Sequence, residues 1–264
     1  MKNLIISHLP ASYPWQGNIY YLNTIDSTNT RAKEMAAQGA PHGTVLIADS
    51  QTGGRGRMGR SFHSPAGCGI YLSMILRHGC PAKELLPLTC ATAVAAADGI
   101  QTATGLRPGI KWTNDLVVGK KKIGGILTEL SLDGNGNVEY AVIGIGINCN
   151  QSADDFPAEI QSIATSLRMC TGNAIDRAAV IAQILVALQK ISEKLQTPTA
   201  ILDHYRADCI TIGQEISLVR GDEVRHGKAL DVDNEGALVV EFDDGTTQAV
   251  QSGEVSIRGM YGYV

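Results

Sequence analysis

Two secondary-structure patterns meet near Ile212-Gly213 in this chain of 264 residues. Before that point, strand-like apolar segments alternate with helix-like segments, whereas after it short strands follow one another with only turns between them. Alternation of strands and helices is typical of an α/β sheet flanked by helices, and a run of short strands is typical of a small β-barrel. We therefore predict an α/β domain over residues 1–212 and a small all-β domain over residues 213–264.

The apolar patterns predict the elements of both domains. Strands of the larger domain are predicted at 18–23, 44–49, 69–76, 110–112, 123–131 and 138–148. Its helices are predicted at 27–38, at 88–102 and from 176 onward, the last because of one apolar stripe formed by Val180, Ile184, Leu188, Ile191 and Leu195. Strands of the smaller domain are predicted at 215–219, 225–232, 237–242, 246–250 and 255–258.

A loop between two of these strands carries three arginines among glycines. Residues 53–60 read Gly-Gly-Arg-Gly-Arg-Met-Gly-Arg, and Arg55, Arg57 and Arg60 keep their charge at any working pH. A guanidinium can hold a carboxylate or phosphate with two hydrogen bonds, and glycines let the backbone fold closely around a ligand. We interpret this arginine loop as an anion clamp, although by itself it also fits a solvated basic surface that touches nucleic acid.

The arginine loop also contains the spacing of a dinucleotide-binding fingerprint, at Gly54, Gly56 and Gly59. That fingerprint requires a helix to begin at the loop, so that the helix N-terminus meets the pyrophosphate. The following residues include Pro65 and two glycines and do not start a helix, and no acidic residue stands about twenty positions further on. A dinucleotide site of this type is excluded, and the pattern of a P-loop does not occur.

A second cluster of polar and charged residues occupies 111–116 and 120–127. Asn114 and Asp115 are turn-forming residues between apolar segments, which predicts a β-hairpin with a lysine-rich tip. Lys122 differs from the two lysines before it because it begins a strand, so its side chain has a defined direction. Asp115 could bind a metal, accept a proton or form a structural ion pair.

The charge balance is mildly acidic, with 22 lysines and arginines against 26 aspartates and glutamates and a net charge of −4. A nucleic-acid-binding surface needs a broad basic face, so this balance favours a small anionic ligand held in a local positive cleft. The six cysteines show no C-x-x-C pair or zinc spacing and are interpreted as reduced thiols. Because the sequence shows no signal peptide and no apolar run of membrane-spanning length, a cytoplasmic protein is expected.

From about residue 19 to residue 150 the sequence resembles biotin protein ligases, whose motifs it contains in the same order and at compatible spacing. The matching segments are Asp26-Ser27-Thr28-Asn29, Gln51-Thr52, the arginine loop, Lys111-Trp112-Thr113-Asn114-Asp115-Leu116, Lys122-Ile123-Gly124-Gly125-Ile126-Leu127 and Gly144-Ile145-Gly146-Ile147-Asn148-Cys149-Asn150. Thr113 stands where the family usually has proline and Phe62 where it has tryptophan, and neither change removes a charged group.

The resemblance implies a fold and an activity. The catalytic domain of the family is a mixed β-sheet flanked by helices, of the class II aminoacyl-tRNA-synthetase type, followed by an SH3-like β-barrel. These enzymes use ATP and Mg²⁺ to form biotinyl-5′-adenylate and then transfer biotin to a lysine of a biotin carboxyl carrier protein. Some members carry a DNA-binding winged helix ahead of the catalytic domain. Only residues 1–17 precede the first predicted strand, so we expect a monofunctional ligase without sequence-specific DNA binding. A homodimer and the identity of the carrier are left open.

The resemblance also implies roles for individual residues. Those expected in catalysis are Lys122, Arg57 and Asp115. Those expected at biotin are Ser27, Thr28, Asn29, Gln51, Gly54, Arg55, Gly56, Arg57, Lys122, Gly125 and Gly144. Those expected at ATP are Arg55, Arg57, Arg60, Phe62, Lys111, Asn114, Asp115, Lys122 and Asn148. Metal ligands are not identified, and Asp115 either assists the incoming amine or orients Lys111 and the metal. Residues 150–159 are expected to form a second mobile lid near the adenine.

Two other functions fit parts of the sequence. A lipoate or octanoate ligase shares the catalytic architecture, but its plain acyl chain would leave the polar side chains at 27–29 and 51 little to bind. A nucleic-acid-binding module could use the arginine loop and the barrel, but it predicts a basic chain and a steep salt dependence. Biotin ligation is therefore the favoured function.

Overall fold

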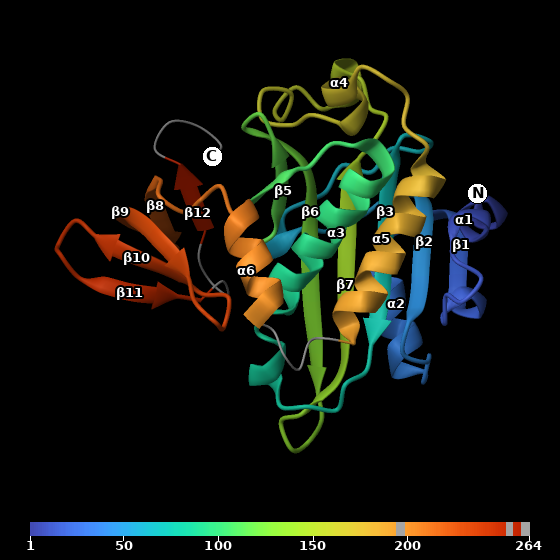
Figure 1. The fold of residues 1–264 in the computed structure, drawn as a ribbon, viewed down its shortest axis with the longest axis horizontal. Helices are drawn as coiled ribbons and strands as arrows, with labels where there is room; N and C mark the ends of the chain where they lie inside the picture. The colour runs from blue at the N-terminus through green and yellow to red at the C-terminus, as the bar shows by residue number, and fades with distance from the viewer. Residues whose placement is uncertain (194–198, 252–255, 260–264) are drawn as a thin grey trace.

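A computed structural model describes residues 1–193, 199–251 and 256–259 of the chain. The strands form two sheets, and helices pack on the larger one (Figure 1). No helix among these residues is both long and apolar enough to cross a membrane.

The larger sheet has seven strands in the order β1-β2-β3-β7-β6-β5-β4. β1 and β2 are parallel and every other neighbouring pair is antiparallel, so the predicted mixed sheet is confirmed. The strands are β1 (Ile19–Ile25), β2 (Thr44–Gln51), β3 (Gly69–Leu76), β4 (Gly109–Lys111), β5 (Asp115–Val118), β6 (Lys121–Leu132) and β7 (Val138–Asn148).

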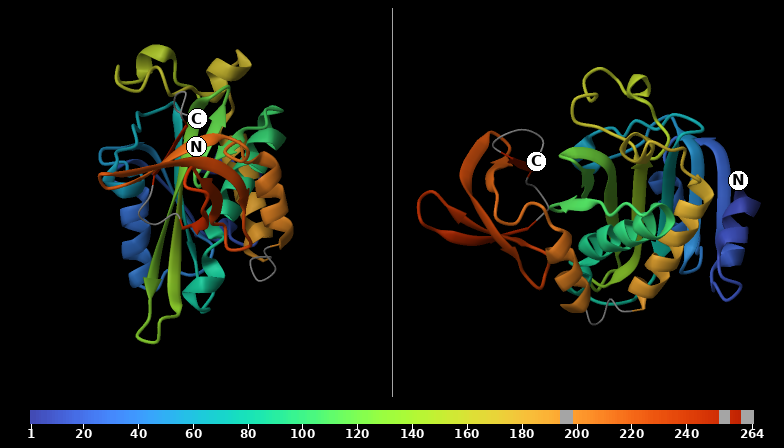
Figure 2. Two further views of the ribbon diagram at one scale, coloured as in Figure 1. Left: turned by 90° about the vertical axis from the view of Figure 1, so that its left-hand side faces the viewer. Right: turned by 45° about the horizontal axis from the view of Figure 1, so that its top comes forward.

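Helices cover both faces of this sheet, as Figure 2 shows edge-on. α2 (Thr28–Ala37) packs on one face, whereas α3 (Leu88–Thr104) and α5 (Arg177–Ser192) pack together on the other. α1 (Lys2–His8) contacts α5, whereas α6 (Thr199–Asp208) contacts α3. The short α4 (Leu167–Thr171) follows β7 and precedes α5 along the chain.

Local sequence explains how the predicted helices begin and pack. The side chain of Ser27 accepts a hydrogen bond from Thr30 N at the start of α2, and Asp176 accepts two from the first turn of α5. α3 is rich in alanine and largely buried, and its Gly99 lies so close to α5 that a Cβ would stand 2.6 Å from Ile184. Small residues therefore allow α3 and α5 to approach closely beneath the sheet.

The smaller sheet is antiparallel, with five strands in the order β11-β10-β9-β8-β12. The strands are β8 (Glu215–Arg220), β9 (Glu223–Val232), β10 (Leu238–Phe242), β11 (Thr247–Val250) and β12 (Ser256–Gly259). It contacts the larger domain near the turn between β4 and β5, where Trp112 Nε1 donates to Gly236 O (3.0 Å). Arg206 of α6 donates to Val232 O (2.6 Å) at a second contact.

Four helices and strands were not predicted from the sequence: α1, α4, α6 and β5. α6 contributes its buried Ile201, Leu202 and Tyr205 to the common core, and it is a short helix of ten residues. The predicted turn at Asn114-Asp115 is wrong in one respect, because Asp115 is the first residue of β5 and its backbone pairs with Gly125. Leu195 of the predicted stripe lies outside the described residues, and so does the first residue of the strand predicted at 255–258.

Candidate functional site

A cavity of about 160 Å³ lies where the start of α2, the arginine loop and the strands β5, β6 and β7 meet. Most of the residues predicted for the site line it: Ser27, Thr28, Asn29, Gln51, Arg55, Gly56, Arg57, Arg60, Phe62, Lys111, Asn114, Asp115, Lys122, Gly125 and Gly144. Residues from positions 27 to 146 are thus brought together at one place by the mixed sheet.

Two predicted site residues do not line the cavity. Gly54 lies in the stem of the arginine loop, where a Cβ would stand 2.6 Å from Ser64 Oγ. Asn148 is buried at the end of β7 and donates to Thr165 O (3.1 Å), which belongs to the connection after β7. Both residues therefore support neighbouring segments in this structure.

The lining also contains residues that were not assigned from the sequence: Met58, Ser61, Leu72, Trp112, Ile126, Leu127, Ile145 and Gly146. Most are apolar, and six of them lie inside the arginine loop or the matching segments: Met58, Trp112, Ile126, Leu127, Ile145 and Gly146. Alternation along a strand does not select them, because Ile126 and Leu127 are consecutive on β6 and Ile145 and Gly146 are consecutive on β7. They give the cavity an apolar wall beside its charged residues.

Lys122 and Asp115 form an ion pair in the cavity, with Lys122 Nζ 2.6 Å from Asp115 Oδ1. A Cβ on Gly125 would stand 3.1 Å from that Nζ and 3.4 Å from that Oδ1, so glycine at this position leaves room for the pair. The backbone of Lys122 is held separately, by Ile163 O (2.8 Å) and Thr165 N (2.9 Å). The amine is therefore fixed in direction by both its strand and its carboxylate partner.

Arg57 reaches across the cavity from the arginine loop to the turn between β4 and β5. Its Nη1 donates to Asn114 Oδ1 (3.0 Å), and Asn114 Nδ2 donates to Ile126 O (2.9 Å). Burial lowers the pKa of Arg57, while the nearby charge of Asp115 acts in the opposite direction. A guanidinium stays protonated despite such a shift, so Arg57 presents a partly desolvated positive charge.

The arginine loop is a tight hairpin in this structure. Phe62 N donates to Gly54 O (2.9 Å), and Gly56 N donates to Arg60 O (2.7 Å). At its tip Met58 has φ 56°, in the left-handed region that non-glycine residues rarely adopt. The arginines therefore project from a defined backbone rather than from a featureless coil.

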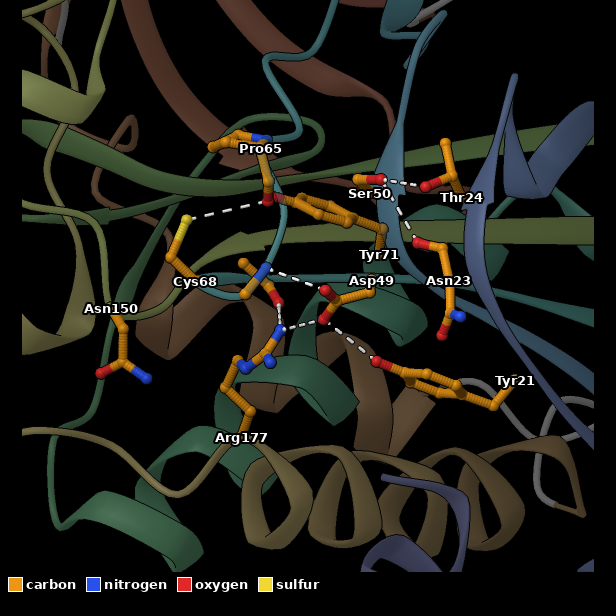
Figure 3. A network of polar contacts seen from close by, with 12 residues as sticks. Tyr21, Asn23, Thr24, Asp49, Ser50, Pro65, Cys68, Tyr71, Asn150 and Arg177 are labelled. Carbon is orange, nitrogen blue, oxygen red and sulfur yellow. Dashed lines mark hydrogen bonds and ion pairs between the residues drawn. The ribbon is translucent and has the colours of Figure 1, made fainter.

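Polar contacts fix the end of this hairpin to the body of the domain (Figure 3). Asp49 accepts from Gly67 N (3.1 Å) and pairs with Arg177 Nη1 (3.0 Å) at the start of α5. Tyr71 on β3 donates from its hydroxyl to Pro65 O (2.9 Å). The hinge on the C-terminal side of the arginine loop is thus tied to β2, β3 and α5.

A buried hydrogen-bond network underlies the polar residues at 27–29 and 51, which are expected at biotin. Gln51 Oε1 accepts from both the backbone N (2.8 Å) and the hydroxyl (3.1 Å) of Thr28. Ser73 Oγ lies 2.9 Å from Thr28 Oγ1 and 2.6 Å from Asn29 Oδ1. Ser73, which is fully buried on β3, was not predicted and orients two residues that were.

The predicted second lid contacts the segment that follows the arginine loop. Residues 153–155 form a short 3-10 turn, and Asp155 O lies 3.0 Å from His63 Nε2. His63 therefore connects the two segments. Mobility of the lid stays a prediction.

The charges of the cavity suit an anionic ligand. Its lining carries five basic side chains and, among the described residues, one carboxylate: Arg55, Arg57, Arg60, Lys111, Lys122 and Asp115. Preorganised cations in a partly buried site stabilise negative charge much more than they would in water. No group of three or more histidine, cysteine, aspartate or glutamate side chains within the described part of the chain could hold a metal ion alone.

Comparisons with known proteins agree with this chemistry. Residues 21–148 match the biotin/lipoate A/B protein ligase family, and residues 211–258 match the biotin protein ligase C-terminal domain. The bifunctional ligase/repressor BirA of Bacillus spizizenii is 42% identical over 230 residues, which cover 86% of this chain and 70% of that protein. The biotin–[acetyl-CoA-carboxylase] ligase of Mycobacterium tuberculosis is 32% identical over 236 residues, 87% of this chain and 85% of that protein. The structure of the biotin protein ligase of Aquifex aeolicus in complex with biotin and ATP aligns with a TM-score of 0.78 at 30% identity, covering 92% of this chain and 99% of that one.

Proposed function

Because the chain belongs to the biotin/lipoate A/B protein ligase family, we propose that it is an ATP-dependent biotin protein ligase. It forms biotinyl-5′-adenylate from biotin and ATP and transfers the biotinyl group to a lysine of a biotin carboxyl carrier protein. The supporting observation is the cavity itself, in which five cations from the arginine loop, β4 and β6 converge beside an apolar wall.

The first step brings two anions together. A carboxylate oxygen of biotin attacks the α-phosphorus of ATP, the bond from that phosphorus to the bridging oxygen breaks, and pyrophosphate leaves. Lys122 and Arg57 neutralise the carboxylate and the phosphates and hold them in line, because fixed charges need no reorganisation as the reaction proceeds. Arg55 and Arg57 also close the arginine loop over the product, and Arg60, Lys111 and Asn114 bind the phosphate side.

In the second step the lysine amine of the carrier attacks the carbonyl carbon of the adenylate. The amide bond forms, the bond to the phosphate oxygen breaks, AMP leaves, and the nitrogen loses a proton. Asp115 is the carboxylate of the lining and is the group assigned to accept that proton. In this structure Asp115 accepts a hydrogen bond from Lys122 Nζ, so its carboxylate also orients the ammonium group of Lys122.

A magnesium ion that arrives with ATP would be held mainly by substrate phosphates and water together with one or two carboxylates, and Asp115 is the carboxylate of the described lining that would contribute. Such an ion would neutralise charge on the phosphates of ATP.

The proposal extends to partners and location. The carrier is a biotin carboxyl carrier protein of a biotin-dependent carboxylase, and the chain acts in the cytoplasm. It does not bind DNA sequence-specifically, because its positive side chains converge on a ligand cavity and its net charge is −4. Residues 1–212 carry the chemistry, and residues 213–264 support the nucleotide side through Gly236.

Incubation with labelled biotin, MgATP and a purified carrier domain tests the function. Label on the carrier, lost when its target lysine is replaced by arginine, is the expected result. The absence of both pyrophosphate release and carrier labelling would overturn the proposal. A parallel reaction with lipoate tests the related acyl ligase function, and lipoylation of a lipoyl carrier in preference to biotinylation would favour that alternative.

A further inference from the structure

Glu129 on β6 contacts three side chains from two segments that are far from it in the sequence. Its Oε2 accepts from Asn29 Nδ2 (3.0 Å) at the start of α2. Its Oε1 lies 2.7 Å from Lys33 Nζ on the same helix and 3.4 Å from Arg55 Nη2 of the arginine loop. The Glu129 side chain is 20% exposed and does not itself line the cavity. One carboxylate thus connects the helix and the loop that form the biotin side.

The contacts of Asn29 explain why this connection matters. Its Nδ2 donates to both Glu129 and Leu127 O (3.2 Å), so both amide hydrogens are used. Its Oδ1 accepts from Ser73, and a Cβ on Gly144 would overlap that oxygen. The Asn29 side chain is therefore locked within the protein. Ser73, which donates to Asn29 Oδ1, also lies 2.9 Å from Thr28 Oγ1, and Thr28 lines the cavity.

Arg55 contacts the Glu129 carboxylate from the arginine loop. Its backbone pairs with Ser61 in the stem of the hairpin, but its side chain is 46% exposed. The Glu129 carboxylate attracts this guanidinium toward β6. Because the contact with Glu129 already restrains the Arg55 side chain, that side chain loses less conformational entropy when a ligand binds.

We propose that Glu129 is a positioning residue that holds the start of α2 and the arginine loop in the arrangement that binds biotin. The expected change in KM rests on the proposed function. The claim that Glu129 holds the helix and the loop in place does not depend on that function. Loss of the carboxylate charge should loosen the arginine loop and misalign the biotin side. The nucleotide side, which Lys111 and Asn114 form, should change little.

Glu129→Gln tests the idea, because it keeps the size and hydrogen-bonding capacity of the side chain and removes its charge. We expect the KM for biotin to rise about tenfold, while the KM for ATP stays within twofold of wild type. We also expect trypsin to cut the arginine loop, after Arg55, Arg57 or Arg60, at least fivefold faster than in wild type without any ligand.

Lys33→Met is the matched control, since Lys33 contacts the same carboxylate but leaves Asn29 and Arg55 attached to it. Lys33→Met should keep near wild-type values for both readouts. The inference is overturned if Glu129→Gln, shown to be folded by its circular dichroism and thermal transition, keeps the wild-type KM for biotin and the wild-type rate of trypsin cleavage. It is also overturned if Lys33→Met reproduces both changes. A wild-type protein that makes no biotinyl-adenylate refutes the proposed function instead, and the proteolysis result would still decide the positional claim.

Discussion

Replacement of Lys122 by methionine should slow adenylate formation far more than it destabilises the protein. Methionine keeps the apolar stem of the side chain and removes the ammonium group that stands 2.6 Å from Asp115 Oδ1. The backbone contacts of Lys122 to Ile163 and Thr165 do not depend on its side chain, so the strand and the segment beside it should stay in place.

The two expected magnitudes differ clearly. Loss of one preorganised stabiliser of developing negative charge typically costs about 10²–10³ in rate, or roughly 3–4 kcal/mol. The stability cost comes from removing one charged partner of Asp115, and a removed partner of this kind costs about 1–3 kcal/mol. Because the Asp115 side chain is 18% exposed and water can solvate it, we expect the lower part of that range.

Biotin-dependent exchange of labelled pyrophosphate into ATP measures the first step directly, and a thermal melt measures stability. Lys121→Met is the matched control: it removes the same charge from the neighbouring strand position, whose side chain points to the other face and does not line the cavity. Exchange at a near wild-type rate in folded Lys122→Met would refute the assignment of this lysine. An equal loss in Lys121→Met would show that net charge, rather than position, is responsible.

Three further outcomes are expected. Arg57→Gly should still form the adenylate but release it sooner, so that label appears on bystander proteins as well as on the carrier. Trp112→Phe, which removes the donor to Gly236 O, should raise the KM for ATP several-fold and leave the KM for biotin unchanged. Burial and the nearby His42 lower the pKa of His78 below 6.5. The unfolded chain therefore binds more protons than the folded one between that lowered pKa and about 6.5, and stability should fall as the pH drops through this window.

Each of these outcomes has a result that would contradict it. Wild-type bystander labelling by Arg57→Gly would limit Arg57 to synthesis. Equal changes in both KM values for Trp112→Phe would mean that the contact serves general stability rather than the nucleotide side. Chemical denaturation of wild type and His78→Gln at several pH values tests the last point, and parallel pH profiles would exclude His78 as the cause.

Most of the helices and strands, and most of the residues that line the cavity, could be predicted from the sequence alone. The predicted bounds of β3 and β7 agree with the structure residue for residue, because apolar runs bounded by turn formers mark strands whatever their neighbours are. The starts of α2 and α5 were also predictable, since Ser27 and Asp176 satisfy backbone groups of their own helices. The arginines and Lys122 were recognisable because their chemistry and spacing are local properties.

The contacts that the cavity residues make with other side chains depend on the tertiary structure. Glu129 is about a hundred positions from Asn29, and Trp112 is more than a hundred from Gly236, so no local pattern indicates that they touch. Alternation along a strand predicts which residues share a face, but the order of strands in the sheet determines what that face meets. Asn29 lines the cavity as predicted, but no local pattern indicates that its amide is hydrogen-bonded to Glu129, Leu127 and Ser73. A hydrogen bond depends on the position of both partners, and the position of the second partner is a property of the folded chain.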